Sequence, residues 1–243
     1  MSDMSEMSEL PEFGRSAPDD IASLIRAQIN GGQLSPGDRL PNERELAVQL
    51  GVARLTLRQA LRLLIGEGYL SSKRGNSGGT FVTDLSQPHL VWLERVRRHP
   101  EWAVDLIEFR KAVEERAAVL AASRATDEQL QAMRVSVAEA AEPASRGVFR
   151  QADHRFHATV AEASGSPRLL AAVVQARGEL FVPVDAIQYR DRFTQTCEEH
   201  AAILDAIQRH DAAAAAAAME AHLESSLRDL LDMVAQLPHP GQT

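Results

Sequence analysis

Along the first third of the chain, hydrophobic residues recur three or four positions apart, which is the spacing of one face of a helix. Three such stretches follow each other, and each ends at a glycine, as helices often do. The first ends at Gly31-Gly32, the second runs from about Pro41 to Gly51, and the third spans roughly Ala53 to Gly66. The positions predicted to face inward are Ile21, Leu24, Ile25, Ile29, Leu46, Leu50, Leu57, Leu61 and Leu64.

After Gly68 the pattern changes from helical to strand-like. The segment YLSSKRGNSGGTFVTD, residues 69–84, has two short strand-like pieces around a turn of Gly, Asn and Ser, which predicts a β-hairpin. Three helices followed by a hairpin is the order of a winged helix-turn-helix. In that module the third helix enters the major groove of DNA, and the hairpin reaches the flanking backbone.

From Asp105 onward every segment has a helical pattern, and the breaks fall at short turns. Aromatic residues are only 5% of the chain, while alanine and leucine are abundant, which favours helices over sheets. The predicted fold class is therefore mainly α, with a winged helix-turn-helix followed by an all-α helical bundle. The predicted bundle helices lie near 105–123, 127–142, 146–164, 167–183, 189–209 and 211–236.

The chain divides into five predicted parts. The N-terminal tail is rich in Ser, Glu and Met without a period, which is typical of disorder. The junction between the two domains contains Trp92 and Trp102 and is too apolar for a flexible tether, so we expect both rings to dock on a domain. The parts are a disordered tail (1–17), the winged helix-turn-helix (18–84), the junction (85–104), the helical bundle (105–237) and a final tail (238–243).

Charge is unevenly distributed along the chain. The whole sequence has a net charge of −8, which by itself argues against a polyanionic partner. Residues 21–83 contain eight Lys and Arg against four Asp and Glu, a balance of +4, whereas residues 85–243 contain seventeen against twenty-three, a balance of −6. A basic module joined to an acidic one is the pattern left by a small nucleic-acid-binding domain.

Three features indicate the cellular compartment. The chain has no run of eighteen apolar residues, so no membrane span is predicted. Its N-terminus, MSDMSEMSELPEF, lacks a hydrophobic signal core. The single Cys197 offers neither a disulfide framework nor a thiolate metal cluster. We therefore expect a cytoplasmic protein without a membrane partner.

The third predicted helix carries a cationic stripe. Arg54, Arg58 and Arg62 are four residues apart and so share one face. Arg54 and Thr56 lie at the N-terminal end, which penetrates deepest into the groove, and arginine can bond guanine edges or phosphates. The alternative is a solvated helix face with salt bridges, but the surrounding winged module favours DNA contact. Further candidate contacts are Arg44 on the preceding helix and Lys73 and Arg74 at the head of the hairpin.

Four polar residues of the bundle have spacings that would bring them together. Asp153 and His157 are four apart on one helix, while His200 and His222 lie about ten residues before and eleven after a predicted turn at 210–211. Antiparallel helices would place the last two rings at nearly the same height. Three imidazoles and a carboxylate suit Zn²⁺, Ni²⁺, Mn²⁺ or Fe²⁺. The alternative is four ordinary surface or core residues, as we expect for His89, His99, His154, His210 and His239.

The segments LPNERELAVQLGVARLTLRQAL and GYLSSKRGNSGGTFV resemble the DNA-binding domain of GntR-type bacterial transcription regulators, over about residues 19–83. The resemblance implies a homodimer on a palindromic operator, with repression as the commoner mode of action. It assigns operator contacts to Arg44, Arg54 and Arg58, an assisting role to Thr56, and the wing tip to Gly75.

Two residues depart from this family pattern. Ala53 stands where the family usually has Ser or Thr, so it lacks a hydroxyl that would cap the helix or contact a phosphate. Leu55 replaces a residue that is commonly small or polar. We therefore expect an unusual operator sequence or affinity.

The bundle has a resemblance of its own. LIEFRKAVEERAAVLAA, FRQADHRFHATVAEASGSPRLL, EEHAAILDAI and MEAHL are similar to the ligand-binding domain of the FadR subfamily, called FCD, over about 105–234. Members with Asp-x-x-x-His and two later histidines bind a divalent metal inside the bundle, with zinc as our first choice here. The four positions of that pattern are matched by Asp153, His157, His200 and His222.

The same resemblance addresses the effector. Members that sense fatty acyl-CoA lack this histidine set, so that effector class is disfavoured. Arg110 matches an arginine that reaches the ligand carboxylate in similar proteins. The alternative for Arg110 is a helix-surface ion pair with Glu114.

Together these features predict a metabolite-responsive, DNA-binding transcription regulator and not an enzyme. A small organic acid would enter the bundle, complete the coordination of the metal and contact Arg110, which would bias the spacing of the two DNA-binding heads. One alternative makes the metal ion itself the signal. Another is a metal-dependent hydrolase or lyase, but no separate residue is placed as its general base, and it leaves the winged module unexplained.

Overall fold

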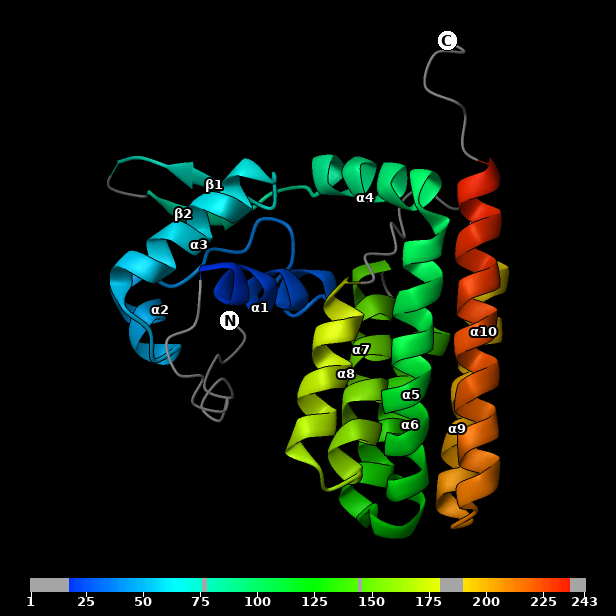
Figure 1. Ribbon diagram of the computed structural model, residues 1–243. Coiled ribbons are helices and arrows are strands. Elements are labelled where there is room, and N and C mark those ends of the chain that lie inside the picture. Colours follow the sequence, from blue (N-terminus) through cyan, green and yellow to red (C-terminus); the bar gives the residue numbers. More distant parts are fainter. Residues whose placement is uncertain (1–17, 76–77, 144–145, 180–189, 237–243) are drawn as a thin grey trace. The chain divides into compact units, whose positions relative to one another are not determined.

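The computed structural model describes residues 18–75, 78–143, 146–179 and 190–236. Within these ranges the chain forms ten helices and one two-stranded hairpin (Figure 1), which confirms the mainly α fold class. By its internal contacts the chain divides into two units. One unit comprises the residues up to Ile29 together with Leu34–Pro88, and the other comprises Asn30–Gln33 together with the residues from His89 onward.

The first unit is a winged helix-turn-helix. Its two strands are antiparallel, with Leu70 paired with Val82 and Lys73 paired with Gly79. The inward-facing Ile25, Leu57 and Leu64 are almost completely buried, as the hydrophobic pattern predicted. The elements of this unit are α1 (Pro18–Asn30), α2 (Glu43–Gln49), α3 (Arg54–Gly66), β1 (Leu70–Lys73) and β2 (Gly79–Val82).

Local chemistry sets the ends of α2. The sequence placed its start near Pro41, but the helix begins at Glu43 because Asn42 is its N-cap and accepts hydrogen bonds from the backbone N–H groups of Arg44 and Glu45. Gly51 follows the helix with a φ of 65°, a left-handed conformation that glycine adopts without strain. This tight end turns the chain directly into α3.

The remaining described helices follow the predicted bundle pattern closely. Two predicted ends, at 183 and 189, lie outside the described residues. The capping box predicted for the second bundle helix is present, with Thr126 and Gln129 bonded reciprocally. The helices are α4 (Ser86–Arg98), α5 (Pro100–Arg124), α6 (Asp127–Ala141), α7 (Arg146–Ala163), α8 (Pro167–Glu179), α9 (Arg190–Gln208) and α10 (Ala212–Gln236).

The segment predicted as a junction is helical. It contains α4 and the first turn of α5, so the first bundle helix starts at Pro100 and not near residue 105. Proline is tolerated in the first turn of a helix, where its missing N–H would have no partner in any case. Trp92 packs edge-on against Trp102 at 6.3 Å and donates a hydrogen bond to the Glu179 carbonyl, so the junction is anchored to the second unit.

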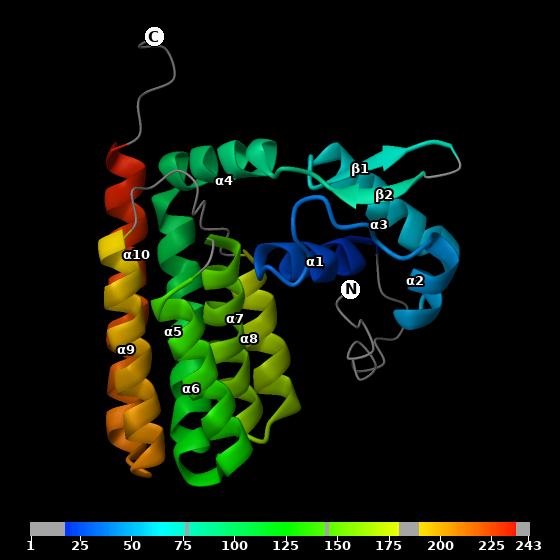
Figure 2. The ribbon, with the colours of Figure 1, turned by 180° about the vertical axis from the view of Figure 1, so that it is seen from behind.

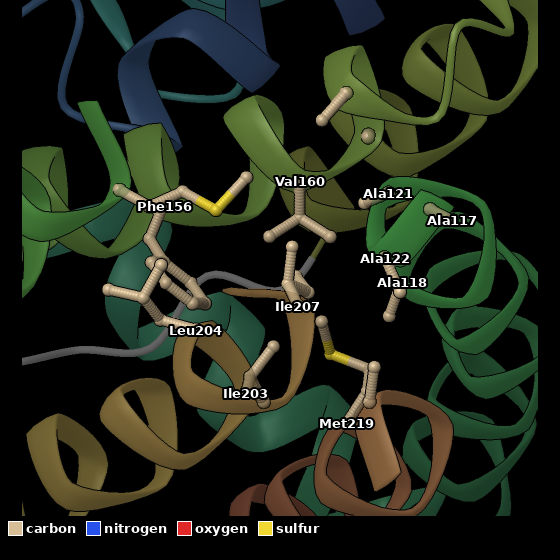
Figure 3. Packing of buried hydrophobic residues seen from close by; sticks show 14 of the residues in the cluster. Ala117, Ala118, Ala121, Ala122, Phe156, Val160, Ile203, Leu204, Ile207 and Met219 are labelled. Carbon is tan, nitrogen blue, oxygen red and sulfur yellow. The ribbon is translucent and has the colours of Figure 1, made fainter. Parts of the chain in front are cut away.

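The core of the second unit draws buried residues from each of the helices α5 to α10. Helix α10 lies beside α5 and α9, and α7 lies beside α5 and α6 (Figures 1 and 2). Figure 3 shows Phe156 and Val160 of α7 meeting Ile207 of α9 and Met219 of α10, with small alanines of α5 closing the cluster. Each large apolar side chain buried here contributes about 1.5–3 kcal/mol. The core therefore fixes the rotation of the helices that carry the predicted ligands.

No helix among the described residues is both long enough and apolar enough to cross a lipid bilayer.

Candidate functional site

Four side chains from three helices bring their ligand atoms together inside the second unit. Asp153 and His157 are one turn apart on α7, His200 comes from α9, and His222 comes from α10. Their ligand atoms all lie within 4.8 Å of one another. Nε2 of His157 is 3.2 Å from Nε2 of His200 and 3.2 Å from Nε2 of His222. The predicted convergence of these four residues is confirmed, and we call them the His₃Asp cluster.

The spacing within the His₃Asp cluster fits a first-row divalent ion. With metal–nitrogen bonds of about 2.0–2.1 Å, tetrahedral ligand atoms lie about 3.3–3.4 Å apart. Oδ1 of Asp153 is 3.5 Å from Nε2 of His200, and this distance and the two of 3.2 Å lie close to that value. The distance from Oδ1 to Nε2 of His157 is longer, at 3.9 Å. Imidazoles with one carboxylate are donors that suit Zn²⁺, Ni²⁺, Mn²⁺ and Fe²⁺.

Two glutamates outside the cluster orient two of its imidazoles. Nδ1 of His157 donates to Oε2 of Glu114 over 2.5 Å, and Nδ1 of His222 donates to Oε2 of Glu199 over 2.8 Å. An ionised carboxylate only accepts hydrogen bonds, so each ring carries its hydrogen on Nδ1 and turns the Nε2 lone pair toward the cluster. Two lone pairs 3.2 Å apart repel each other unless a cation lies between them, so this geometry favours a bound cation.

The third imidazole is held by stacking. The His200 ring lies nearly parallel to Phe156, with ring centroids 4.1 Å apart and an interplanar angle of 11°. Its buried Nδ1 has no hydrogen-bond partner among the residues that the structure describes. Because Phe156 precedes His157 on α7, one helix supplies two residues of the cluster and the surface that orients a third.

Burial and charge set the protonation states of the cluster. Burial lowers the pKa of His157 and of His200 well below its usual value, and the positive charge of Arg177 lowers both further. Burial alone would raise the pKa of Asp153, but Arg177 and the three imidazoles outweigh it and hold that pKa well below its usual range. At neutral pH these groups are in the deprotonated forms that bind metal ions.

Two buried arginines flank the His₃Asp cluster. Nε of Arg110 donates to Oε1 of Glu114 over 2.7 Å, and Arg110 is only 1% exposed. The ion pair considered for this arginine is therefore present, but it lies in the interior and not on the helix surface. On α8, Nη2 of Arg177 donates to Oδ2 of Asp153. In the described part of the chain, Nη2 of Arg110 and Nε of Arg177 are buried without a hydrogen-bond partner.

Sequence reasoning missed three contributors to this site. Glu114 was considered only as a partner of Arg110, although it also binds His157. Glu199 precedes a predicted ligand and faces His222, and Arg177 faces Asp153 from another helix. The spacing of Arg110 and Glu114, four residues apart, was a usable signal for their pairing. No comparable signal pointed to Arg177, because its contact depends on how α8 is rotated against α7.

The predicted DNA contacts lie on exposed positions of the first unit. Arg44, Arg54 and Arg58 are exposed, and Thr56 is half-buried. Arg58 pairs with Glu43 of α2, with Nη2 and Oε2 3.0 Å apart. The salt bridge considered as the alternative is therefore present at Arg58. Because the pair is exposed, the guanidinium can exchange Glu43 for a phosphate.

The hairpin presents basic groups near its turn. Lys73 lies with its Nζ 5.0 Å from the centre of the Phe81 ring. Arg74 and Gly75 are exposed, and Gly75 has a φ of 112°, which favours glycine at this position. Residues 76 and 77, in the predicted turn, lie outside the described residues. The DNA-contact roles of the hairpin and of α3 remain predictions.

Comparisons with known proteins agree with this architecture. Residues 18–82 match the bacterial regulatory proteins of the gntR family, and residues 105–225 match the FCD domain. The putative L-lactate dehydrogenase operon regulatory protein of Escherichia coli (strain K12) is 37% identical over 226 residues, which cover 86% of this chain and 84% of that protein. The galactonate operon transcriptional repressor of the same strain is 29% identical over 224 residues, which cover 88% and 97%.

A solved structure gives the same fold at lower identity. Escherichia coli McbR/YncC superposes with a TM-score of 0.53 over 90% of this chain and 99% of that chain, at 18% identity. The winged module, the helical bundle and these relatives define the chain as a DNA-binding transcription regulator and not an enzyme. It belongs to the GntR family of bacterial regulatory proteins, and its C-terminal part is an FCD domain.

Proposed function

We propose that this protein is a metal-dependent repressor that binds a palindromic operator as a homodimer in the cytoplasm and responds to a small carboxylic acid. The observation that carries the sensing half is a buried His₃Asp cluster flanked by two arginines that each keep an unpaired N–H. The DNA-reading half is supported by exposed cationic residues on a winged module of the matched family.

In the proposed complex with DNA, some residues of the first unit contact the bases and others contact the sugar-phosphate backbone. Arg54 and Thr56 at the N-terminal end of α3 face the bases, and Arg58 lies one turn further along. Arg44 on α2, with Arg74 and Gly75 in the wing, contacts the sugar-phosphate backbone. The proposed DNA-binding domain comprises residues 18–84, and the proposed metal- and effector-binding domain comprises residues 105–237.

In the sensing half, Asp153, His157, His200 and His222 hold the metal, with zinc as the first choice and Ni²⁺, Mn²⁺ or Fe²⁺ as alternatives. A bound divalent ion supplies positive charge and open coordination positions to an oxygen ligand. Glu114 and Glu199 keep two of the imidazoles in the ligating tautomer through their Nδ1 hydrogens.

The buried charges favour an anionic effector. The two guanidinium groups of Arg110 and Arg177 face three carboxylates, those of Glu114, Asp153 and Glu199, a balance of −1. The rings of His157 and His200 are neutral. A divalent cation therefore leaves the site with excess positive charge, which an acid offsets. Nη2 of Arg110 is the donor proposed for its carboxylate. The two Escherichia coli relatives are named for L-lactate dehydrogenase and galactonate operons, so L-lactate and galactonate are the first acids to test.

Arg54→Ala tests the DNA-reading half. Operator DNA is selected from a random library with the full-length protein, and binding is measured by fluorescence anisotropy. We expect the variant to lose specific operator binding, by at least about 1–3 kcal/mol per contact, while its helical content and metal content stay unchanged. Arg209→Ala, which removes an exposed arginine paired with Asp205, is the matched control and should bind as the wild type does. An Arg54→Ala variant with wild-type operator affinity refutes the assignment.

A further inference from the structure

The His₃Asp cluster is accessible from one side. The side chains of His157 and His200 have no exposed surface and His222 has 4%, whereas Asp153 has 23%. The Arg110–Glu114 pair, which contacts the cluster through His157, is about as deeply buried as the imidazoles. A small molecule that approaches the cluster from solvent therefore meets the Asp153 side first.

Arg177 stands on this accessible side. Its side chain is nine-tenths buried and touches Asp153 through Nη2 alone, at the carboxylate oxygen Oδ2. The other oxygen, Oδ1, faces the imidazoles. A guanidinium that held a carboxylate with its full fork would use two N–H groups in one plane. Here Nε is left over, buried, and without an acceptor in the described part of the molecule.

A buried donor without an acceptor is unfavourable and rare in folded proteins. The unpaired Nε of Arg177 and the unpaired Nη2 of Arg110 both lie beside the same cluster, and the two guanidinium charges repel each other there. A carboxylate that accepts from Nε of Arg177 satisfies this buried donor, and its negative charge also offsets the repulsion between the two guanidinium groups.

We propose that Arg177 is a second effector-binding residue: its free Nε–H receives a carboxylate oxygen of the small acid on the Asp153 side, while Arg110 supplies the deeper donor. This inference rests on the proposed function, since it concerns the same acid. It names a residue to which the acid binds directly, at the side of the cluster that is open to solvent.

A purely positioning role for Arg177 makes a different prediction. If the arginine only holds Asp153 in place, its replacement weakens metal binding, and acid binding falls only because the metal is lost. If Arg177 binds the acid, acid affinity falls while the metal remains. Metal binding without acid and acid binding with metal must therefore be measured separately.

The test uses the full-length protein loaded with Co²⁺, whose visible absorption reports its coordination. The probes are L-lactate and acetate, added to the wild type and to Arg177→Gln, Arg177→Lys and Arg168→Gln. Arg168 is an exposed arginine on the same helix and provides the matched control. Calorimetry measures the Co²⁺ affinity without acid and the acid affinity of the loaded protein. Circular dichroism checks that each variant is folded.

Because Arg177 also donates to Asp153, we expect its two variants to bind Co²⁺ more weakly than the wild type and Arg168→Gln to bind it equally well, so the acid affinity is measured on protein whose spectrum shows full loading. The acid affinity of Arg177→Gln should fall about 10- to 100-fold, the range for a hydrogen bond to a charged group. Arg177→Lys keeps the charge without the planar fork and should lie in between, and Arg168→Gln should match the wild type. If Arg177→Gln does not fold, the acid affinities of Co²⁺-loaded Arg177→Lys and wild type are compared instead, and a lower affinity of the variant supports the proposal.

Three results overturn the proposal. They are an unchanged acid affinity in the Arg177 variants, a loss of acid binding that only follows a loss of Co²⁺, and a wild-type protein whose spectrum and heat do not respond to either acid. Operator binding separates this proposal from the proposed function. Acid that binds through Arg177 but leaves operator affinity unchanged contradicts the effector role and leaves this inference standing.

Discussion

Glu114 links the two parts of the proposed sensing site. One of its carboxylate oxygens accepts from Nε of Arg110 and the other accepts from Nδ1 of His157. Its negative charge therefore holds the arginine proposed for the acid and also fixes the tautomer of a proposed metal ligand. The binding of metal and of acid should depend on each other through this carboxylate.

Replacement of Glu114 by Gln tests this link. The amide removes the negative charge that supports the His157 hydrogen on Nδ1, so we expect metal affinity to fall about 10- to 100-fold. Competition with a chromophoric chelator measures that affinity in the full-length protein. Glu108→Gln, on the exposed side of the same helix, is the control and should have the affinity of the wild type. Equal metal affinity in all three proteins contradicts the role assigned to Glu114.

At the residue scale, the sequence predicted the convergence of the His₃Asp cluster better than its supporting residues. Asp153 and His157 were found because a helix repeats every 3.6 residues, and His200 with His222 because both lie equally far from one turn. Glu199 and Arg177 could not be found in this way. Their partners lie on other helices, and the rotation that brings them into contact is set by core packing, as between Phe156 and Val160 of α7 and Ile207 of α9.

At the scale of elements, the start of α3 lacks its expected cap. Ala53 occupies the N-cap position with an extended conformation, φ −67° and ψ 138°, but alanine has no side-chain oxygen to accept from the first turn. The helix that carries Arg54 and Thr56 therefore begins with backbone N–H groups that are free to bond water or phosphate.

Ala53→Ser should stabilise this first turn by about 0.5–2 kcal/mol, because a serine hydroxyl can accept from the orphan N–H groups. Hydrogen exchange of the full-length protein, followed by mass spectrometry of the peptides that cover α3, measures the effect as slower exchange near Arg54. Exchange in α10 is the internal reference and should not change. Unchanged exchange at the start of α3 contradicts this account of the cap.

The sequence predicted some helix starts well, including those of α6 and α8, and missed the starts of α4 and α5. The reciprocal bonds of Thr126 and Gln129 mark the start of α6, and the sequence placed it correctly. The predicted junction contains Pro88 and Pro100, and both lie in the first turns of helices, α4 and α5. A proline near the start of a helix is indistinguishable from a helix breaker when the sequence is considered alone.

For the whole molecule, local charge matters more than net charge. The chain carries −8 overall, yet residues 21–83 have a balance of +4, and Arg44, Arg54 and Arg58 are exposed there. Because salt screens charges beyond about 8–10 Å, we expect the charges next to the predicted reading surface to govern its attraction for DNA more than the net charge of the chain does.

Operator affinity should accordingly fall steeply with salt. Each phosphate contact contributes about −0.9 to the slope of log affinity against log salt concentration. We expect Arg44→Ala to reduce the magnitude of this slope by about 1 and to weaken binding to all sequences alike. Anisotropy titrations of the selected operator and of a scrambled duplex at several salt concentrations measure both effects. A change of sequence preference without a change of slope would place Arg44 on the bases instead.

The proposed metal pocket and the DNA-reading surface should act as one switch, and the most direct test is the operator dissociation constant in three states. The full-length protein is measured metal-free, loaded with Zn²⁺, and loaded with Zn²⁺ in saturating L-lactate or galactonate. We predict high affinity in the zinc state and a loss of about 5- to 150-fold when an acid is added, the usual range of allosteric coupling. A full response to zinc without acid would make the metal itself the signal, and the same constant in all three states would contradict the account.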